Sequence, residues 1–161
     1  MSERTGWRLS GQRRTKPFHY TMCGLDDVYL LNGYRMHRTR EGHGISITNV
    51  DDLHRAIGRR IVDHKKLLAG KELRFLRAQL DLTQSELARL IGCDAQQIAR
   101  YEKGENKIPG PADRLLRMIY LSHIDDGVDV RVVLQSLDEL DVRPSEDQVF
   151  KVTPEGWRSA A

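Results

Sequence analysis

The sequence of Thr83–Gly104 reads TQSELARLIGCDAQQIARYEKG, and this stretch decides which fold the chain can form. Its first part places apolar side chains at Leu87, Ala88 and Ile91, a spacing that puts them on one face of a helix. Gly92 follows directly, and glycine readily adopts the left-handed conformation in which a chain turns sharply out of a helix. The pattern predicts a short amphipathic helix that ends in a tight turn.

A second short helix is predicted immediately after this turn. Asp94 is a suitable N-cap because its carboxylate can accept hydrogen bonds from the next backbone amides. Ile98 and Tyr101 continue the buried face, and Gly104 ends the helix. The opposite face carries small, amide and basic residues, namely Ala95, Gln96, Gln97, Arg100 and Lys103. Two short helices joined by a turn, with such groups outside, are typical of a helix-turn-helix that enters the major groove of DNA.

The flanking segments complete a small helical bundle. A helix with leucines on one face is predicted over residues 71–80, and residues 105–111 form a loop that leads into a closing helix. Thr83 and Glu86 have the spacing of a capping box, in which each side chain bonds the backbone amide of the other residue. Gln84 lies in the first turn of the following helix, where its amide and the exposed backbone amides can meet a phosphate.

The composition indicates a soluble protein with room for one medium domain or two small ones. Hydrophobic residues make up 39% of the 161 residues and charged residues 30%. There is no run of about 18 apolar residues, and the N-terminus lacks the apolar segment of a secretion signal. We therefore expect a cytoplasmic protein without a membrane partner, in which Cys23 and Cys93 do not form a disulfide.

The net charge of +3 is unevenly distributed. Residues 1–20 hold five basic residues and one acidic residue, whereas residues 122–161 hold nine acidic and four basic residues. A basic start and middle with an acidic tail favours nucleic acid as a partner at one end. Solvated, disordered termini explain the same blocks of charge equally well. In either case we expect a flexible basic arm over residues 1–17.

The segment that follows the arm is predicted to form strands. Val28–Leu31 is a short β-rich run, and Asn32-Gly33 is a strong signal for a hairpin turn into a return strand at Tyr34–Thr39. A second turn at Glu41–Gly44 leads to the alternating segment Ile45–Thr48. The expected structure is a three-stranded antiparallel meander, which is too small to be stable without a packing partner.

That partner is predicted to be a helix capped by Asn49 or Asp51. Apolar residues recur along it at helical spacing, namely Leu53, Ala56, Ile57, Ile61 and Leu68. The expected fold class is therefore α+β. A small antiparallel β-meander plus helix occupies residues 18–69, and an all-α helix-turn-helix domain occupies residues 70–124.

The C-terminal part is less regular. A helix is predicted over Val128–Leu140, and the β-branched residues leave a strand at Val128–Val133 as the alternative. Residues 142–161 show no periodicity, and Trp157 is their one large apolar anchor. Residues 125–161 are therefore expected to form a C-terminal helix and an acidic tail that either docks or is disordered.

The sequence contains neither a metal-binding motif nor a catalytic motif. Structural zinc needs four ligands, usually in close pairs such as CxxC. Residues 18–54 contain Cys23 and four histidines, namely His19, His37, His43 and His54, but no CxxC pair, so no metal ligand is assigned. The GxSxG, P-loop, HExxH and Gly-rich nucleotide motifs are also absent. We expect no catalytic residue and no cofactor, with ribonuclease activity as a minor alternative.

Residues 70–121 resemble the XRE family, the helix-turn-helix of Cro and the lambdoid phage repressors. The resemblance is carried by Leu73, Arg77, Leu82-Thr83-Gln84, Leu87-Ala88, Gly92, Ile98 and Tyr101-Glu102-Lys103-Gly104. It implies an all-α domain of the five-helix type. A β-rich module placed before such a domain also resembles the layout of MqsA-type antitoxins, although this chain lacks their zinc-binding cysteine pairs.

The XRE resemblance implies a role for each matching position. The residues expected to contact DNA are Thr83, Gln84, Ala95, Gln96, Gln97, Arg100, Lys103, Asn106 and Lys107. Gln84 would contact a phosphate, the exposed residues from Ala95 to Arg100 would face base edges, and those after Arg100 would hold the DNA backbone. Arg77 and Glu102 match a pair that forms a partly buried ion pair inside the fold.

The predicted function is sequence-specific binding of double-stranded DNA by a repressor. One helix-turn-helix reads only a few base pairs, so useful specificity requires a homodimer on a palindromic operator. Residues 18–69 and Val128–Leu140 are both candidates for the dimer surface. The alternative is an antitoxin whose N-terminal module binds a protein toxin, while the helix-turn-helix autoregulates the operon.

Overall fold

The computed structural model describes residues 16–125, 127–140 and 146–160. Its strands are β1 (Phe18–His19), β2 (Val28–Leu30), β3 (Tyr34–Thr39), β4 (Gly42–Ile47), β5 (Gln148–Thr153) and β6 (Gly156–Ser159). Its helices are α1 (Val50–His64), α2 (Gly70–Gln79), α3 (Gln84–Ile91), α4 (Ala95–Glu102), α5 (Gly110–Ile124) and α6 (Val130–Glu139). Antiparallel strands come first and helices follow, so the predicted α+β class is confirmed. Most of the predicted basic arm lies outside the described residues.

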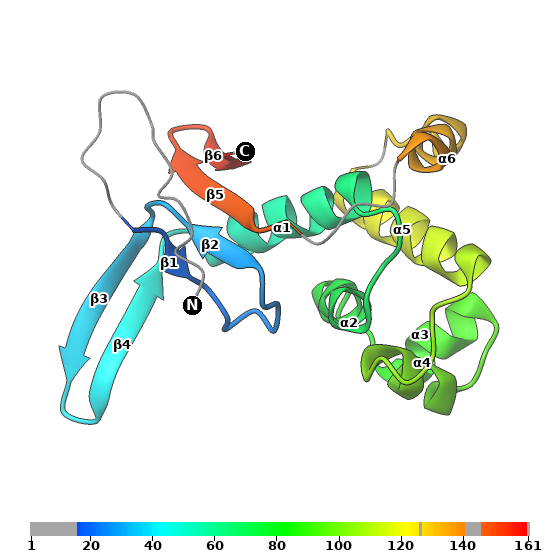
Figure 1. The fold of residues 1–161 in the computed structure, drawn as a ribbon, viewed down its shortest axis with the longest axis horizontal. Helices are drawn as coiled ribbons and strands as arrows, with labels where there is room; N and C mark the ends of the chain where they lie inside the picture. Colours follow the sequence, from blue (N-terminus) through cyan, green and yellow to red (C-terminus); the bar gives the residue numbers. More distant parts are fainter. Residues whose placement is uncertain (1–15, 126, 141–145, 161) are drawn as a thin grey trace.

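Helix α1 connects the two ends of the molecule. In Figure 1 the strands gather at one end, α2 to α5 lie at the other, and α1 runs between them. Leu53, Ile57 and Ile61 of α1 are fully buried, as their spacing predicts. Gly58 faces α5, where an added Cβ would lie 2.0 Å from the Tyr120 hydroxyl. Only glycine lets the two helices approach this closely, so α1 packs tightly against both halves of the core.

The strand pairing differs from the predicted three-stranded meander. Strand β2 pairs with β1 in antiparallel and with β5 in parallel orientation, whereas β3 and β4 form a separate two-stranded sheet. Asn32-Gly33 therefore does not form a hairpin between β2 and β3. The Asn32 amide instead bonds the Val152 backbone in both directions, at 2.8 and 3.3 Å. An added Cβ on Gly33 would lie 2.6 Å from the Trp157 ring, so this turn is shaped by the C-terminal strands.

The second predicted turn is also displaced. Strand β4 begins at Gly42 and not at Ile45, so the hairpin turns at Arg40-Glu41. Gly42 has a φ of 134°, which favours glycine, and the Thr39 hydroxyl donates to its carbonyl oxygen at 2.9 Å. Glycines that read as a turn in the sequence therefore lie at the start of a strand.

The end of the chain forms a hairpin that the sequence analysis did not predict. Strand β5 lies beside β2, and β6 pairs with β5 and packs against α1. Trp157 is 1% exposed, its backbone amide donates to Asp52 Oδ2 at 2.6 Å, and its Nε1 donates to the Thr48 carbonyl at 2.8 Å. The chain thus returns to complete the sheet that its first strands begin. The predicted helix before this hairpin forms as α6, and residues 142–145 lie outside the described residues.

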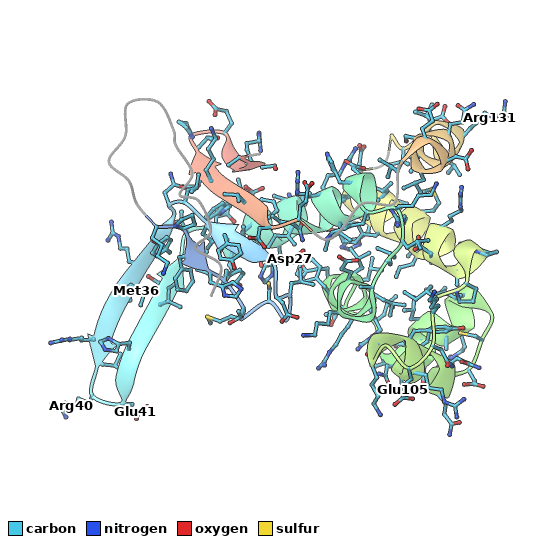
Figure 2. All side chains as sticks on the ribbon, viewed as in Figure 1. Asp27, Met36, Arg40, Glu41, Glu105 and Arg131 are labelled. Carbon is cyan, nitrogen blue, oxygen red and sulfur yellow. The ribbon has the colours of Figure 1, made fainter. Side chains whose placement is uncertain are left out.

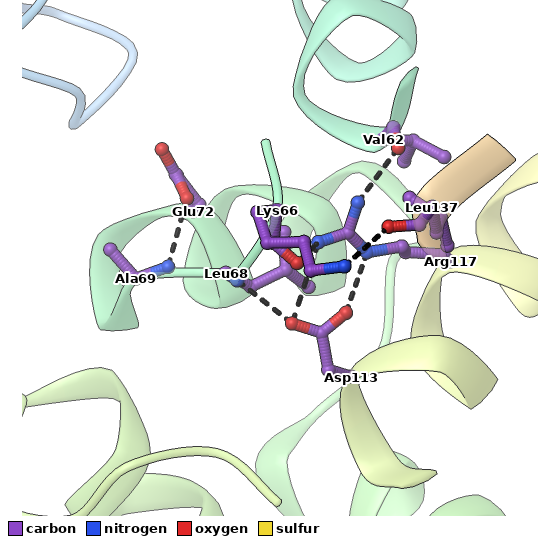
Figure 3. A network of polar contacts seen from close by, with 8 residues as sticks. All are labelled: Val62, Lys66, Leu68, Ala69, Glu72, Asp113, Arg117 and Leu137. Atoms are coloured by element: carbon purple, nitrogen blue, oxygen red, sulfur yellow. Dashed lines mark hydrogen bonds and ion pairs between the residues drawn. The ribbon is translucent and has the colours of Figure 1, made fainter. Parts of the chain in front are cut away.

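A buried polar network ties α1 to the helical half (Figure 3). Arg117 of α5 is 0% exposed and donates to Asp113 Oδ1 at 2.6 Å and to the Val62 carbonyl at 2.8 Å. Asp113 Oδ2 also accepts from the Leu68 amide at 2.8 Å. Lys66, in the connection between α1 and α2, donates to the Leu137 carbonyl at 2.9 Å and so reaches α6. Four segments are therefore held together by one set of charge-assisted hydrogen bonds.

An ion pair holds α4 against α2. Arg77 Nε donates to Glu102 Oε1 at 2.5 Å and Arg77 Nη2 to Glu102 Oε2 at 3.2 Å, while Nη1 donates to the Leu82 carbonyl at 2.8 Å. The two side chains are 16% and 6% exposed. Such a bidentate pair fixes orientation as well as adding energy.

Replacing Trp157 with alanine should destabilise the sheet half of the molecule. The substitution leaves a cavity beside Gly33 and an unpaired Thr48 carbonyl, so the free energy of unfolding should fall by about 3–5 kcal/mol. Urea denaturation followed by circular dichroism measures this loss. Glu155→Ala, at an exposed position before β6, is the matched control and should change it by less than about 0.5 kcal/mol. Equal stability of the two variants would contradict the docked hairpin.

Replacing Arg77 with methionine should destabilise the helical half, because Glu102 then remains as an uncompensated and largely buried charge. Loss of one partner from such a pair typically costs about 3–5 kcal/mol. The double variant Arg77→Met with Glu102→Leu should recover much of the loss, and Arg74→Met, at an exposed position of α2, should change little. Thermal melts of the four proteins decide the matter. A double variant no more stable than Arg77→Met would mean that the pair is not what limits stability.

Candidate nucleic-acid interface

The first motif helix, α3, begins with the predicted capping box. The Thr83 hydroxyl accepts from the Glu86 amide at 3.2 Å, and Glu86 Oε2 accepts from the Thr83 amide at 2.7 Å. The hydrogen bond from the Thr83 backbone is the main reason why the pKa of Glu86 lies below its usual value. The start of α3 is therefore fixed locally, as the sequence predicts.

The turn between α3 and α4 follows the predicted chemistry. Gly92 adopts a left-handed conformation with a φ of 86°, and its amide donates to the Ala88 carbonyl at 2.8 Å. Asp94 then caps α4 by accepting from the Gln97 amide at 2.9 Å. Leu87, Ala88 and Ile98 are at most 2% exposed, so the two helices pack through their apolar faces. The polar face of α4 is left for solvent or a ligand.

Three residues of the predicted interface lie along this outer face of α4. Gln96, Arg100 and Lys103 are exposed and stand at i, i+4 and i+7, which places them on one side of the helix. They present an amide, a guanidinium and an ammonium group in that order. Ala95 and Gln97 are half-buried beside them.

The loop after α4 extends the same polar surface. Asn106 and Lys107 are exposed, and Asn106 Nδ2 donates to Gln97 Oε1 at 3.5 Å. This contact joins the loop to the middle of α4. Thr83 is exposed at the start of α3.

Gln84 differs from the other predicted contacts. Its side chain is half-buried, and Nε2 donates to Glu102 Oε2 at 2.9 Å. The amide therefore joins the Arg77–Glu102 pair and contributes to the packing of α3 on α4. The sequence could not reveal this contact because it joins residues from different helices.

Two residues that position this surface, Asp113 and Arg117, were not predicted from the sequence. Their only signal is an opposite-charge pair at i and i+4 on a mostly apolar helix. Both are buried, and they hold the connection that enters α2.

Three of these four histidines and Cys23 have hydrogen-bond partners within the fold. His19 bonds the Asp26 carbonyl at 2.7 Å, His37 the Ser46 hydroxyl at 2.7 Å, and His54 the Tyr20 hydroxyl at 2.9 Å. Burial lowers the pKa of His54 and raises that of Cys23. Over residues 16–125, 127–140 and 146–160, no group of three or more His, Cys, Asp or Glu residues could hold a metal ion. The described helices also include none that is long and apolar enough to cross a membrane.

Comparison with known proteins identifies the same region. A family model described as Helix-turn-helix matches residues 73–112, which run from α2 into the start of α5. No curated protein and no solved structure matches the chain. The matched segment contains the capping box, the Gly92 turn and the polar face of α4. The chain therefore carries an XRE-type helix-turn-helix and is a DNA-binding transcriptional regulator of that type.

Proposed function

We infer that the protein is a sequence-specific repressor that binds operator half-sites as a homodimer, with α4 in the major groove. The observation that carries this function is the outer face of α4. Among the described residues, the exposed side chains of Gln96 and Arg100 form no hydrogen bond or ion pair, and they stand beside each other on a helix whose opposite face is buried. A major groove is wide enough to accept a helix with such a face.

Gln96 and Arg100 suit direct contact with base edges. A glutamine amide can bond adenine through two atoms, and a guanidinium can bond guanine in the same way. Each good bidentate contact is worth about 1–3 kcal/mol of discrimination between bases. Ala95 and Gln97 lie beside them and would complete the contact at the start of α4.

The remaining residues suit phosphates. The positions after the base-reading residues are Lys103, Asn106 and Lys107. The last two lie in the loop that Gln97 contacts through Asn106. At the start of α3, the first-turn amides next to Thr83 and Gln84 are directed toward the end of the helix, where they attract anions. The Gln84 side chain donates one hydrogen bond to Glu102. A phosphate at this position would therefore be bound by backbone amides and by the amide hydrogen of Gln84 that Glu102 does not accept.

The antitoxin alternative uses the same DNA-binding surface. It is favoured by the position of the sheet, which lies at the opposite end of the molecule from α4, so that a protein bound to it would leave α4 free (Figure 1). Met22, in the loop before β2, is 69% exposed, and exposed methionines suit adaptable protein contacts. Co-purification of the native chain with the product of an adjacent small reading frame would favour this alternative over a repressor that acts alone.

Substitution at Arg100 and Lys107 separates base contacts from phosphate contacts. Lys107→Ala should weaken binding to operator and random duplex alike, and should lower the slope of log K against log salt concentration by about one unit. Arg100→Ala should mainly weaken operator binding, by about 1–3 kcal/mol, and relax the preference at one base pair. Salt titrations by fluorescence anisotropy measure both effects, on a site defined by footprinting upstream of the gene.

Arg131→Ala, on α6 at the far edge of the molecule, is the control and should change neither affinity (Figure 2). Equal losses of operator and random binding on Arg100→Ala would remove this residue from base reading. If no duplex binds more tightly than random DNA, the repressor function itself is contradicted.

A further inference from the structure

The hairpin of β3 and β4, here called the ribbon (Tyr34–Ile47), has no role in the proposed repressor so far. It projects from the sheet end of the molecule, and neither of its strands pairs with any other described strand (Figure 1). With six residue pairs at about 3.4 Å each, it is about 20 Å long. Tyr34 anchors its base by packing on Phe18, with 4.9 Å between ring centroids.

The register of the ribbon gives it two different faces. One face carries Arg35, His37 and Thr39 of β3, which stand opposite Ser46, Gly44 and Gly42 of β4. The other face is apolar near the base, where Ile45 and Ile47 lie, and becomes basic toward the tip. The first face is therefore a row of polar and basic side chains beside a strip of nearly bare backbone.

The arginines of the ribbon have no side-chain partner among the residues that the structure describes. Arg35, Arg38 and Arg40 are exposed, and Glu41 is the only acidic residue of the ribbon. Within residues 16–125, 127–140 and 146–160, these three guanidinium groups form no ion pair and no hydrogen bond. In contrast, Arg77 and Arg117 are paired inside the core. Arg35 lies on the first face, Arg38 on the other and Arg40 in the turn at the tip, so an excess of positive charge surrounds the outer part of the ribbon and is complementary to a polyanion.

The bare strip leaves room for a ligand to approach. An added Cβ on Gly42 would meet nothing within 4 Å, and one on Gly44 would meet only the Thr39 methyl group at 3.7 Å. Glycine is disfavoured within strands, and while the φ of 134° accounts for Gly42, neither packing nor a positive φ requires glycine at position 44. A two-stranded ribbon with such a face fits closely against a nucleic-acid backbone or into a major groove.

The ribbon tip and α4 lie toward the same edge of the molecule. Figure 2 shows Arg40 and Glu41 at one end of this edge and Glu105, just after α4, near the other end. Since the view is down the shortest axis, the molecule is thinnest along the line of sight. A duplex laid along this edge would meet both elements.

We propose that the ribbon is a second DNA contact, which binds the phosphate backbone flanking the half-site read by α4. This inference rests on the proposed function and adds a surface to it. A second copy of the ribbon is a poorer occupant, because two surfaces with the same excess of arginine repel each other. The ribbon would add affinity without sequence preference, since guanidinium groups on phosphates act on all sequences.

The test compares two duplexes that share the footprinted operator. The short duplex ends at the edges of the half-sites, and the long duplex carries about 15 more base pairs on each side, roughly one and a half helical turns. The triple variant Arg35→Gln, Arg38→Gln and Arg40→Gln should bind the long duplex about tenfold more weakly than wild type, with a salt slope shallower by about 2–3 units. Its binding to the short duplex should be unchanged.

Two controls accompany the triple variant. Arg131→Gln, at the opposite edge, is the matched control for the single variant Arg38→Gln. Arg131→Gln should leave binding to both duplexes unchanged. Thermal melts should show that the triple variant is folded, because all three side chains are exposed. Footprints should lose flanking protection in the triple variant and keep protection of the half-sites.

Equal affinity of wild type and triple variant for the long duplex, at every salt concentration, would overturn the inference. An equal loss of affinity of the triple variant for the short duplex would also overturn it, because the ribbon would then not contact the flanking DNA. The repressor function fails separately, through absence of any preferred site. In that case the salt slope on a long random duplex still tests the ribbon, and no difference between wild type and triple variant there would overturn it.

Discussion

Arg117 is a guanidinium group without solvent exposure, and the relative placement of the two halves of the molecule depends on it. It donates to Asp113 on its own helix, to the Val62 carbonyl near the end of α1 and to the Lys66 carbonyl in the connection that follows, while Asp113 accepts from the Leu68 amide. A buried charge is tolerated only when it is paired and hydrogen-bonded, so this set of contacts permits only one path for the chain between α1 and α2. These contacts therefore connect α1, which packs on the sheet, to α5 of the helical half.

The exposed polar side of α4 is the part of this helix that the packing of the fold does not use. The C-terminal hairpin completes the four-stranded sheet, and its Trp157 bonds residues at the start of α1. Helix α1 in turn packs against α5. On α4, Ile98 is buried and Glu102 is bound to Arg77, so the helix cannot rotate to hide its polar side. In the proposed repressor, α4 held in this way is organised before it meets DNA, which reduces the ordering cost of binding. The ribbon tip points toward the edge on which α4 lies.

The sequence predicted the local features of the site well and the long-range features poorly. The capping box of Thr83, the turn at Gly92 and the exposed face of α4 follow from contacts between residues a few positions apart. The pairing of β2 with β5 joins residues about 120 positions apart, and no spacing rule selects that partner. Val149 and Phe150 are both buried, so the strand lacks the period-two pattern that would have revealed it. The Gln84 side chain was assigned to a phosphate and is bonded inside the fold, a contact that depends on how α3 packs on α4.

The claim that α4 is the element inserted into DNA is tested most directly by amide hydrogen exchange of the intact protein, with and without its operator duplex. Exchange reports the protection of individual segments, so it identifies which surface the duplex covers. The account predicts slower exchange over Ala95–Lys103 and the start of α3 in the complex, with the sheet core of β2 and β5 unchanged. Protection confined to the sheet end, with exchange in α4 the same in the free and bound protein, would contradict it.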